Sequence, residues 1–237
     1  MLGRIAADVA VVAVLGVGSY LTRALDAKGA FSAALLGLAV IELGGFYPFL
    51  ALLAFVVVGV SATKYKFNEK ARLGVAQESG GIRGWENVVG NGLAATVFLI
   101  AEYLSHRDVF WAATFASIAT VNGDTLASEL GKVFGKAPRL ITNFKPARTG
   151  TNGAVSLAGE VFALVGALII APFALPLTAH DTEMLTAVVT GGFIGVNLDS
   201  LIGATLENRG VTDNNSTNLL AALLGGLLGA GVFYALP

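Results

Sequence analysis

The stretch VFWAATFASIATVNGDTLASELGKVFGK, from Val109 to Lys136, joins a predicted membrane span to an unusually polar continuation. A helix that crosses a bilayer needs about 20 mostly apolar residues, and residues 109–127 form such a run. From Val121 onward the stretch carries an Asn, an Asp, a Glu, two Lys and three Gly. Because hydrocarbon disfavours such groups, their presence at the end of a span indicates a cavity or a polar partner.

The composition of the whole chain agrees with burial in a membrane. Of its 237 residues, 55% are hydrophobic and 13% are charged, whereas soluble domains carry about 25% charged residues. Thirty glycines are typical of closely packed transmembrane helices. The absence of Cys excludes disulfides and thiolate metal sites, and two His are too few for a histidine cluster. A net charge of −1 gives no indication of a nucleic-acid partner.

Eight apolar runs predict an all-α, polytopic membrane protein with a single integral membrane domain over residues 1–237. The predicted spans are approximately 5–22, 28–45, 46–63, 88–104, 109–127, 153–172, 185–205 and 216–236. One Arg precedes the first run and Asp8 interrupts it, so we interpret this run as a retained helix rather than a cleaved signal. Gly44-Gly45 and Pro48 separate the second and third runs, which allows a tight turn or a re-entrant segment.

The Lys and Arg residues are distributed unevenly between the two sides of these spans. If the N-terminus is outside, thirteen of them are inside and only Arg4 and Arg107 are outside. Cytoplasmic loops of membrane proteins carry such an excess of positive charge. We therefore predict a cell-membrane protein with both termini outside and two long cytoplasmic loops, residues 64–87 and 128–152.

Acidic and amide side chains gather near the predicted cytoplasmic ends of the spans. Those at this depth are Asp124, Glu160, Asp199, Asn91, Asn122, Asn152, Asn197 and Asn218. Ionisable groups inside a membrane usually face a cavity or a partner. Their concentration in one leaflet predicts a site there, facing the cytoplasm.

A short pattern in this set recurs, because Asn122-Gly-Asp124-Thr-Leu resembles Asn197-Leu-Asp199-Ser-Leu. A Thr-Asn pair that we expect to open the next helix follows each pattern, as Thr151-Asn152 and Thr217-Asn218. Both Asp-bearing spans run in the same direction, so a parallel internal repeat in the C-terminal half would present the two carboxylates at one depth. Such a pair suits Mg²⁺, a hard cation that prefers oxygen ligands. A chance match in a sequence of low complexity is the alternative.

The polar continuation after residue 121 has the residue types of a phosphate site. On a helix, Asp124 and Ser128 share a face and Glu129 lies close by. Gly131 and Gly135 remove side chains, which lets backbone N–H groups approach a ligand. The flanking loop is basic, with Lys132, Lys136, Arg139, Lys145 and Arg148. These groups suit a magnesium-bound polyphosphate.

The loop ends in Thr149-Gly-Thr-Asn-Gly153, which we expect at a helix N-terminus, where free N–H groups attract anions. The segment is not a Walker A loop, because Gly131 and Gly135 are too close together and Ala137 follows Lys136.

Structural explanations exist for each of these residues taken alone. Gly131 and Gly135 also suit tight helix packing or a helix end, and Asp199 can pair with a loop Arg. Basic residues in cytoplasmic loops follow from topology alone. Asn and Thr at helix starts are ordinary caps. The functional interpretation rests on their concentration at one side of the membrane.

Several of these segments resemble integral membrane kinases of isoprenoid phosphates. The stretch from Asp124 to Lys136 is similar to the nucleotide-binding segment of CTP-dependent polyprenol kinases such as dolichol kinase. A closer resemblance is to the family that includes plant and cyanobacterial phytyl-phosphate kinase. Its motifs are present as Gly81-Ile-Arg83-Gly-Trp-Glu-Asn87-Val, Gly123-Asp-Thr-Leu-Ala-Ser-Glu-Leu-Gly131, Pro138-Arg-Leu-Ile-Thr142, Gly150-Thr-Asn-Gly-Ala-Val-Ser156 and Leu198-Asp-Ser-Leu-Ile-Gly-Ala-Thr205.

The resemblance implies a multipass kinase that transfers phosphate from CTP, or a related nucleoside triphosphate, to an isoprenyl monophosphate of the phytyl, geranylgeranyl or farnesyl type. It implies that Asp124, Glu129 and Asp199 are catalytic and bind Mg²⁺. The expected nucleotide- and phosphate-binding residues, from the resemblance and from the polar cluster together, are Arg83, Asn87, Asn91, Ser128, Lys132, Lys136, Arg139, Lys145, Arg148, Thr151, Asn152 and Asn218. Phosphoryl transfer to a phosphate depends on positioning and charge rather than on a strong base, so a chain without an active-site His or Cys can perform it.

Two other functions remain open from the sequence. A cytidylyltransferase that acts on a lipid phosphate would use the same nucleotide, metal and paired aspartates. A transporter or flippase built on a parallel repeat is the second alternative, although the outer halves of the spans carry few polar groups.

Overall fold

The computed structural model describes residues 2–237 and confirms the all-α, polytopic fold. Its long helices are α1 (Leu2–Leu21), α2 (Ala27–Gly44), α3 (Phe46–Lys64), α5 (Trp85–Ser105), α6 (Asp108–Phe134), α7 (Leu157–Ile170), α8 (Asp181–Thr205) and α9 (Asn214–Ala235). The shorter elements are α4 (Phe67–Arg72), η1 (Glu78–Gly81), η2 (Ala171–Leu177), η3 (Glu207–Arg209) and the strand pair β1 (Arg139–Leu140) and β2 (Ala154–Val155). The eight long helices correspond one by one to the eight predicted spans.

Seven of these helices are long and apolar enough to cross a membrane, among the residues that the structure describes, when α7 is taken together with η2 and α8 with η3. The eighth, α6, is the longest at 27 residues but is less apolar. Its central part is buried by neighbouring helices, and it contains Thr114, Ser117 and Thr120, whose hydroxyls donate to carbonyls of their own helix. A helix enclosed by protein can carry small polar groups that lipid would disfavour.

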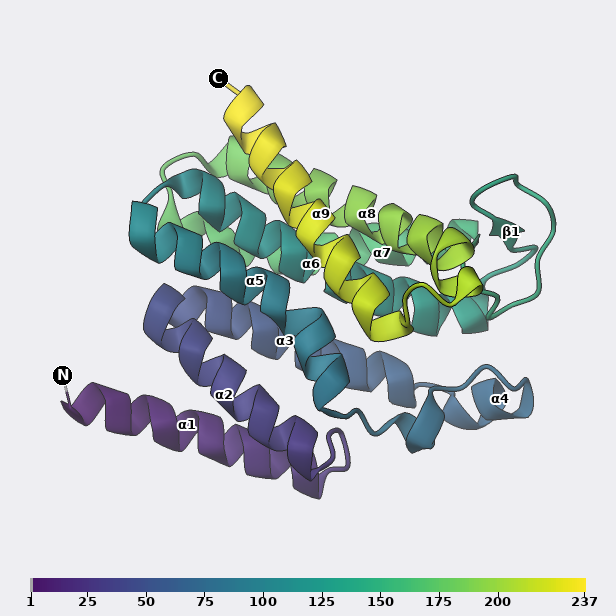
Figure 1. The fold of residues 1–237 in the computed structure, drawn as a ribbon, viewed down its shortest axis with the longest axis horizontal. Helices are drawn as coiled ribbons and strands as arrows, with labels where there is room; N and C mark the ends of the chain where they lie inside the picture. Colours follow the sequence, from purple (N-terminus) through teal and green to yellow (C-terminus); the bar gives the residue numbers. More distant parts are fainter. Residues whose placement is uncertain (1) are drawn as a thin grey trace.

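The bundle has two distinct ends (Figure 1). Both chain termini lie toward one end, which we call the termini end. The α4 segment and the loop that carries β1 lie at the opposite end, which we call the loop end. The arrangement agrees with the predicted even number of spans and with two long loops on one side.

The junction between the second and third spans is a tight turn between two full helices. Gly45 alone separates α2 from α3, and its φ of 78° lies in the region that glycine adopts without strain. The segment therefore consists of two separate helices, each long and apolar enough to cross a membrane.

Glycines allow α8 and α9 to approach α6 closely. An added Cβ on Gly195 of α8 or on Gly225 of α9 would overlap the side chain of Thr120. Gly123 of α6 and Gly166 of α7 are in similar contact, with 2.5 Å between the Cα of Gly123 and a Cβ placed on Gly166. Small residues at such crossings bring backbones together in membranes, and here they gather α7, α8 and α9 around α6.

Two predicted boundaries differ from the structure. The helix that begins at Asp108 continues to Phe134, so Ser128, Glu129 and Lys132 are helical and the following loop begins at Gly135. The next helix begins at Leu157, where the Ser156 hydroxyl accepts from the Gly159 amide at 3.1 Å. The second long loop is therefore residues 135–156 and not 128–152.

Candidate phosphate and metal site at the loop end

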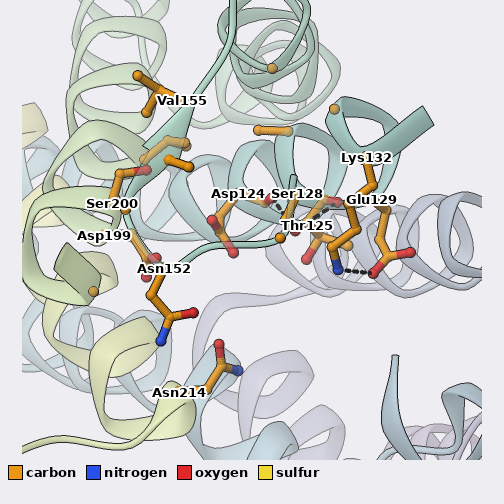
Figure 2. A pocket seen from close by; sticks show the side chains of 18 of the residues that line it. Asp124, Thr125, Ser128, Glu129, Lys132, Asn152, Val155, Asp199, Ser200 and Asn214 are labelled. Carbon is orange, nitrogen blue, oxygen red and sulfur yellow. Dashed lines mark hydrogen bonds and ion pairs between the residues drawn. The ribbon is translucent and has the colours of Figure 1, made fainter. Parts of the chain in front are cut away.

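A polar cavity of about 230 Å³ lies at the loop end of the bundle. Helices α5, α6, α7, α8 and α9 all contribute to its walls, together with residues 149–156 of the second long loop. Figure 2 shows Asp124 from α6 and Asp199 from α8 directed into this space, with Asn152 and Asn214 also labelled around it. Both aspartates line this one cavity, and their joint action on a ligand stays a prediction.

One face of α6 supplies the central polar groups. Asp124, Ser128 and Lys132 follow each other at intervals of four residues, and all three line the cavity. The Ser128 hydroxyl donates to the Asp124 carbonyl oxygen at 2.8 Å. The Asp124 carboxylate forms no salt bridge with any residue of the described chain, so it remains available to a ligand.

Asp199 is likewise without a salt bridge in the part of the chain that the structure describes. Its neighbour on α9 is the amide of Asn218, which is buried. In the orientation that satisfies its hydrogen bonds, the Asn218 amide nitrogen lies 3.2 Å from Oδ2 of Asp199 and 3.0 Å from the Asn214 carbonyl oxygen. Asn91 of α5 lies on the other side of Asn218, at 3.3 Å. A chain of amides thus holds the Asp199 side of the cavity.

The two asparagines of the repeated pattern both bind α7. Asn122 donates to the Gly166 carbonyl oxygen at 2.8 Å, and Asn197 donates to Oε2 of Glu160 at 3.1 Å. Helices α6 and α8, which carry the patterns, run in the same direction (Figure 1). The repeat therefore has a structural counterpart, in which each pattern fixes α7 and directs an aspartate into the cavity.

Glu129 differs from the expectation that it is a metal ligand. Its buried carboxylate forms an ion pair with Lys70 of α4, and its Oε1 lies 3.3 Å from Nζ of Lys132. Both oxygens are thus engaged by lysines, and the residue orients Lys132 at the cavity wall. Sequence spacing placed Glu129 correctly beside Asp124 but did not show the lysine that approaches from another loop.

Arg83 lines the cavity from the first long loop. Its backbone forms hydrogen bonds with the Ala24 carbonyl oxygen at 3.1 Å and with the Asp26 amide at 3.0 Å. Its Nη2 donates to the Thr63 hydroxyl at 3.2 Å. Burial lowers the pKa of Arg83, while the nearby carboxylates of Glu129 and Asp124 oppose that shift. The backbone of Arg83 is thus fixed by two hydrogen bonds and its guanidinium by one, and the residue brings a positive charge to the cavity wall.

Residues 149–153 reach the cavity in a different way from the one expected. They do not open a helix, because α7 begins only at Leu157. They form a turn in which Gly150 and Gly153 have φ values of 84° and 74°, a conformation that favours glycine. The Asn152 amide donates to Oε1 of Glu207 at 2.9 Å, which ties the turn to the connection between α8 and α9. Thr151 and Asn152 line the cavity as predicted, but they do so from this turn.

Four of the predicted basic residues do not line the cavity. Lys136, Arg139, Lys145 and Arg148 belong to the protruding part of the second long loop and are exposed. The Arg139 guanidinium donates to the Phe144 carbonyl oxygen at 2.8 Å and so stabilises the loop itself. Their charge is explained by topology. The predicted residues that line the cavity are Arg83, Asn87, Asn91, Asp124, Ser128, Glu129, Lys132, Thr151, Asn152, Asp199 and Asn218.

Sequence analysis missed Lys70, Glu207 and Asn214. Glu207 lines the cavity from the α8–α9 connection and Asn214 from the start of α9, whereas Lys70 binds Glu129 without lining the cavity. Only the acidic and amide character of Glu207 and Asn214, close to the Asp199 motif, could have indicated them. Nothing in the local sequence distinguishes Lys70 from the other lysines of its loop.

The residues present fit a hard cation. The side chains that face the cavity offer carboxylate, hydroxyl and amide groups, the ligand types that Mg²⁺ accepts. Across residues 2–237, no three Asp, Glu or His side chains are close enough to hold one ion. Glu160 and Glu207 also line the cavity but each accepts a hydrogen bond from an asparagine amide. Asp124 and Asp199 would therefore be the main protein ligands, and substrate oxygens and water would complete the coordination, as Mg²⁺ often requires.

Comparison with known proteins identifies the family. Residues 10–228 match the family described as integral membrane protein DUF92. The chain belongs to this family. An uncharacterized membrane protein of Methanocaldococcus jannaschii is 30% identical over 235 residues, covering 98% of this chain and 96% of that protein. One of Synechocystis is 33% identical over 192 residues, covering 79% and 74%.

A plant relative is also similar to this DUF92 protein. The chloroplastic protein VTE6 of Arabidopsis thaliana is 32% identical over 194 residues, which cover 80% of this chain and 58% of VTE6. No solved structure matches the chain significantly. The comparisons confirm the membrane family expected from the motifs, with plant and cyanobacterial members.

Proposed function

We propose that this protein is a membrane kinase that transfers a phosphate group from CTP, or a related nucleoside triphosphate, to an isoprenyl monophosphate. The observation that carries the proposal is the pairing of two carboxylates without salt bridges, Asp124 and Asp199, with two cations, Arg83 and Lys132, around one cavity. Carboxylates suit a magnesium ion, and the cations suit the phosphates that it accompanies. The motif resemblance and the similarity to a plant chloroplast protein support the substrate class.

The carboxylates and the cations of the cavity have different roles in the proposed reaction. Mg²⁺, when bound by Asp124 and Asp199, would neutralise part of the charge on the phosphate oxygens. Arg83 and Lys132 would bind the transferred group and stabilise its equatorial oxygens. The bond between the terminal phosphorus and its bridging oxygen breaks, a new bond forms to an oxygen of the acceptor phosphate, and the nucleoside diphosphate leaves with the bonding electrons. The acceptor is already ionised, so no side chain must remove a proton from it.

The position of the cavity suits a lipid acceptor and a water-soluble donor. The cavity lies where the spans end, on the same side of the bundle as the exposed basic residues of the second long loop. We propose that this end faces the cytoplasm, since the excess of Lys and Arg lies there. The tail of the acceptor would remain in hydrocarbon while its phosphate reaches the cavity.

One feature disfavours the transporter alternative. The lining of the cavity comes from the loop-end parts of the helices, while residues 111–122 of α6 are buried by side chains of the bundle. A transport pathway needs access from both sides of the membrane, and the middle of α6 is packed against its neighbours instead.

Product analysis tests the proposal against the cytidylyltransferase alternative. Purified protein is incubated with Mg²⁺, labelled CTP and a panel of phytyl, geranylgeranyl and farnesyl monophosphates. The proposal predicts CDP and the isoprenyl diphosphate in equal amounts. Release of pyrophosphate together with a CMP-linked lipid would replace it with cytidylyl transfer. The assay is repeated with ATP, GTP and UTP, and no turnover with any of the four nucleotides and any acceptor of the panel would refute the proposal.

A further inference from the structure

Lys70 is a buried cation that the proposed reaction does not use directly. It belongs to the six-residue helix α4, whose other residues are partly or fully exposed, yet only 1% of its own surface is accessible. A lysine is almost never fully buried unless its charge is paired. The partners of Lys70 therefore indicate what keeps it there.

All three donors of the Lys70 ammonium have acceptors. It donates to the carbonyl oxygens of Ala62 and Thr63 at 3.0 and 2.8 Å, where α3 ends, and it forms the ion pair with Glu129. The carbonyls at a helix C-terminus lack partners within the helix and favour a positive charge. Lys70 thus joins α3, α4 and α6 at a single buried point.

Two short connections lead from this point to the cavity. Glu129, which Lys70 neutralises, lies 3.3 Å from Nζ of Lys132. Thr63, whose carbonyl binds Lys70, accepts from Nη2 of Arg83 through its hydroxyl at 3.2 Å. Lys132 and Arg83 are the two cations to which the proposed function assigns the phosphates. Lys70 reaches both of them without lining the cavity itself.

We propose that Lys70 is a positioning residue that neutralises Glu129 and so keeps Lys132 and Arg83 available to phosphate groups in the cavity. With Lys70 present, the three cations and one carboxylate of this network carry a net charge of about +2, and without it the charge falls to about +1. The remaining Glu129 charge would then attract Lys132 and Arg83 toward itself. The inference rests on the proposed function for the identity of the substrate. Its test, however, measures only the binding of anions and needs no turnover.

The test measures binding of magnesium pyrophosphate, and of CTP with Mg²⁺, to purified variants in detergent. Lys70→Met should weaken both affinities about tenfold, the effect expected from the loss of one nearby charge. Lys70→Met combined with Glu129→Gln removes both charges of the pair and restores the net charge, so it should recover affinity to within about threefold of the parent protein. The unfolding midpoint of each variant is measured in parallel.

Lys66→Met is the matched control. Lys66 is adjacent to α4 and pairs with Glu69 at 3.1 Å on the surface, so its loss removes the same charge from the same loop without touching the network. Its affinities should equal those of the parent protein. An equal loss in Lys66→Met would show that only overall charge matters and would overturn the proposal.

Two further results would also overturn it. One is a folded Lys70→Met protein with unchanged affinities. The other, which applies even if that single variant fails to fold, is a folded double variant that binds both anions at least tenfold more weakly than the parent. If the parent protein binds pyrophosphate but transfers no phosphate, the proposed function fails while the role of Lys70 in anion binding stands.

Discussion

Polar residues at the two ends of the bundle have different surroundings. At the termini end, Asp108 begins α6 and accepts from the Thr178 hydroxyl at 2.9 Å, and the same hydroxyl accepts from the His180 amide at 3.1 Å. At the loop end of the same helix, Asp124 faces the cavity and forms no salt bridge in the described chain. One aspartate completes the local structure, and the other is left for a ligand.

This contrast separates structural from functional polarity. Asp108 lies at a helix N-terminus, where a negative charge is stabilised by the helix itself. Asp124 and Asp199 lie late in their helices, where that stabilisation is absent, and they face the same space. Neighbouring carboxylates repel each other, and the cations that line the same cavity, Arg83 and Lys132, form no salt bridge with either of them in the described chain. The loop end thus leaves both aspartates unpaired around an open space.

The largest expected difference between the two ends is their accessibility in cells. A Cys introduced at position 145, in the second long loop, should react with a membrane-impermeant thiol reagent only after the cells are permeabilised. A Cys at position 180, at the termini end, should react in intact cells. The prediction follows from the excess of Lys and Arg at the loop end. Labelling of position 145 in intact cells would reverse the orientation.

The next largest effect, on turnover, should come from removing the charge of one aspartate at each end of the bundle. Asp124→Asn keeps the size of the side chain but removes the charge that a hard cation needs, so turnover should fall about 100-fold or more. Asp108→Asn should leave turnover unchanged and lower the free energy of unfolding by about 1 kcal/mol. Steady-state rates of the folded proteins check both. A folded Asp124→Asn protein with near-normal turnover would remove Asp124 from the site.

A second comparison, within the loop end, is between a lysine that lines the cavity and a lysine of the protruding loop. Lys132→Gln should reduce kcat/KM about tenfold, because Lys132 lines the cavity. Lys145→Gln should change it by less than about twofold, because Lys145 is exposed on the protruding loop and surface charges at that distance are screened. Equal losses from the two variants would indicate that the protruding loop closes onto the substrate.

The smallest effect should come from two glycines. At Gly153, φ is 74° and an added Cβ would overlap Ala204 and lie 2.6 Å from the Ser200 carbonyl oxygen. Gly153→Ala should therefore lower the unfolding free energy by about 1–3 kcal/mol and weaken nucleotide binding. Gly231→Ala near the C-terminus meets no atom within 4 Å and should be neutral or slightly stabilising. Denaturation midpoints measure both effects. Equal midpoints for Gly153→Ala and Gly231→Ala would contradict the predicted strain at Gly153.

Local sequence was sufficient for the helices and for the Asp-bearing face of α6. Apolar runs determine spans, and spacing by four determines that Asp124 and Ser128 share a face. The boundaries near the site were less predictable, because Ser128, Glu129 and Lys132 are polar but helical. They line a cavity that other helices and loops help to form, and only Glu129 among them is buried, so no pattern in their own segment indicates this environment.

Contacts between segments that are distant in the sequence could not be predicted from local sequence patterns. Lys70 and Glu129 are far apart in the sequence, and their pairing depends on α4 folding against the end of α3. The basic residues of the protruding loop show the converse case. Their charge and position suggested phosphate binding, but only the path of the loop shows that Arg139 and Lys145 do not line the cavity.

The most direct test of the shared site compares Asp124→Asn, Asp199→Asn and the double variant under saturating substrates. If the two carboxylates act on one magnesium-bound phosphate group, each single substitution should lower turnover about 100-fold, and the double variant should be little worse. That result would support a single functional unit formed by α6 and α8. Losses that multiply in the double variant, or a folded Asp199→Asn protein with normal turnover, would contradict it.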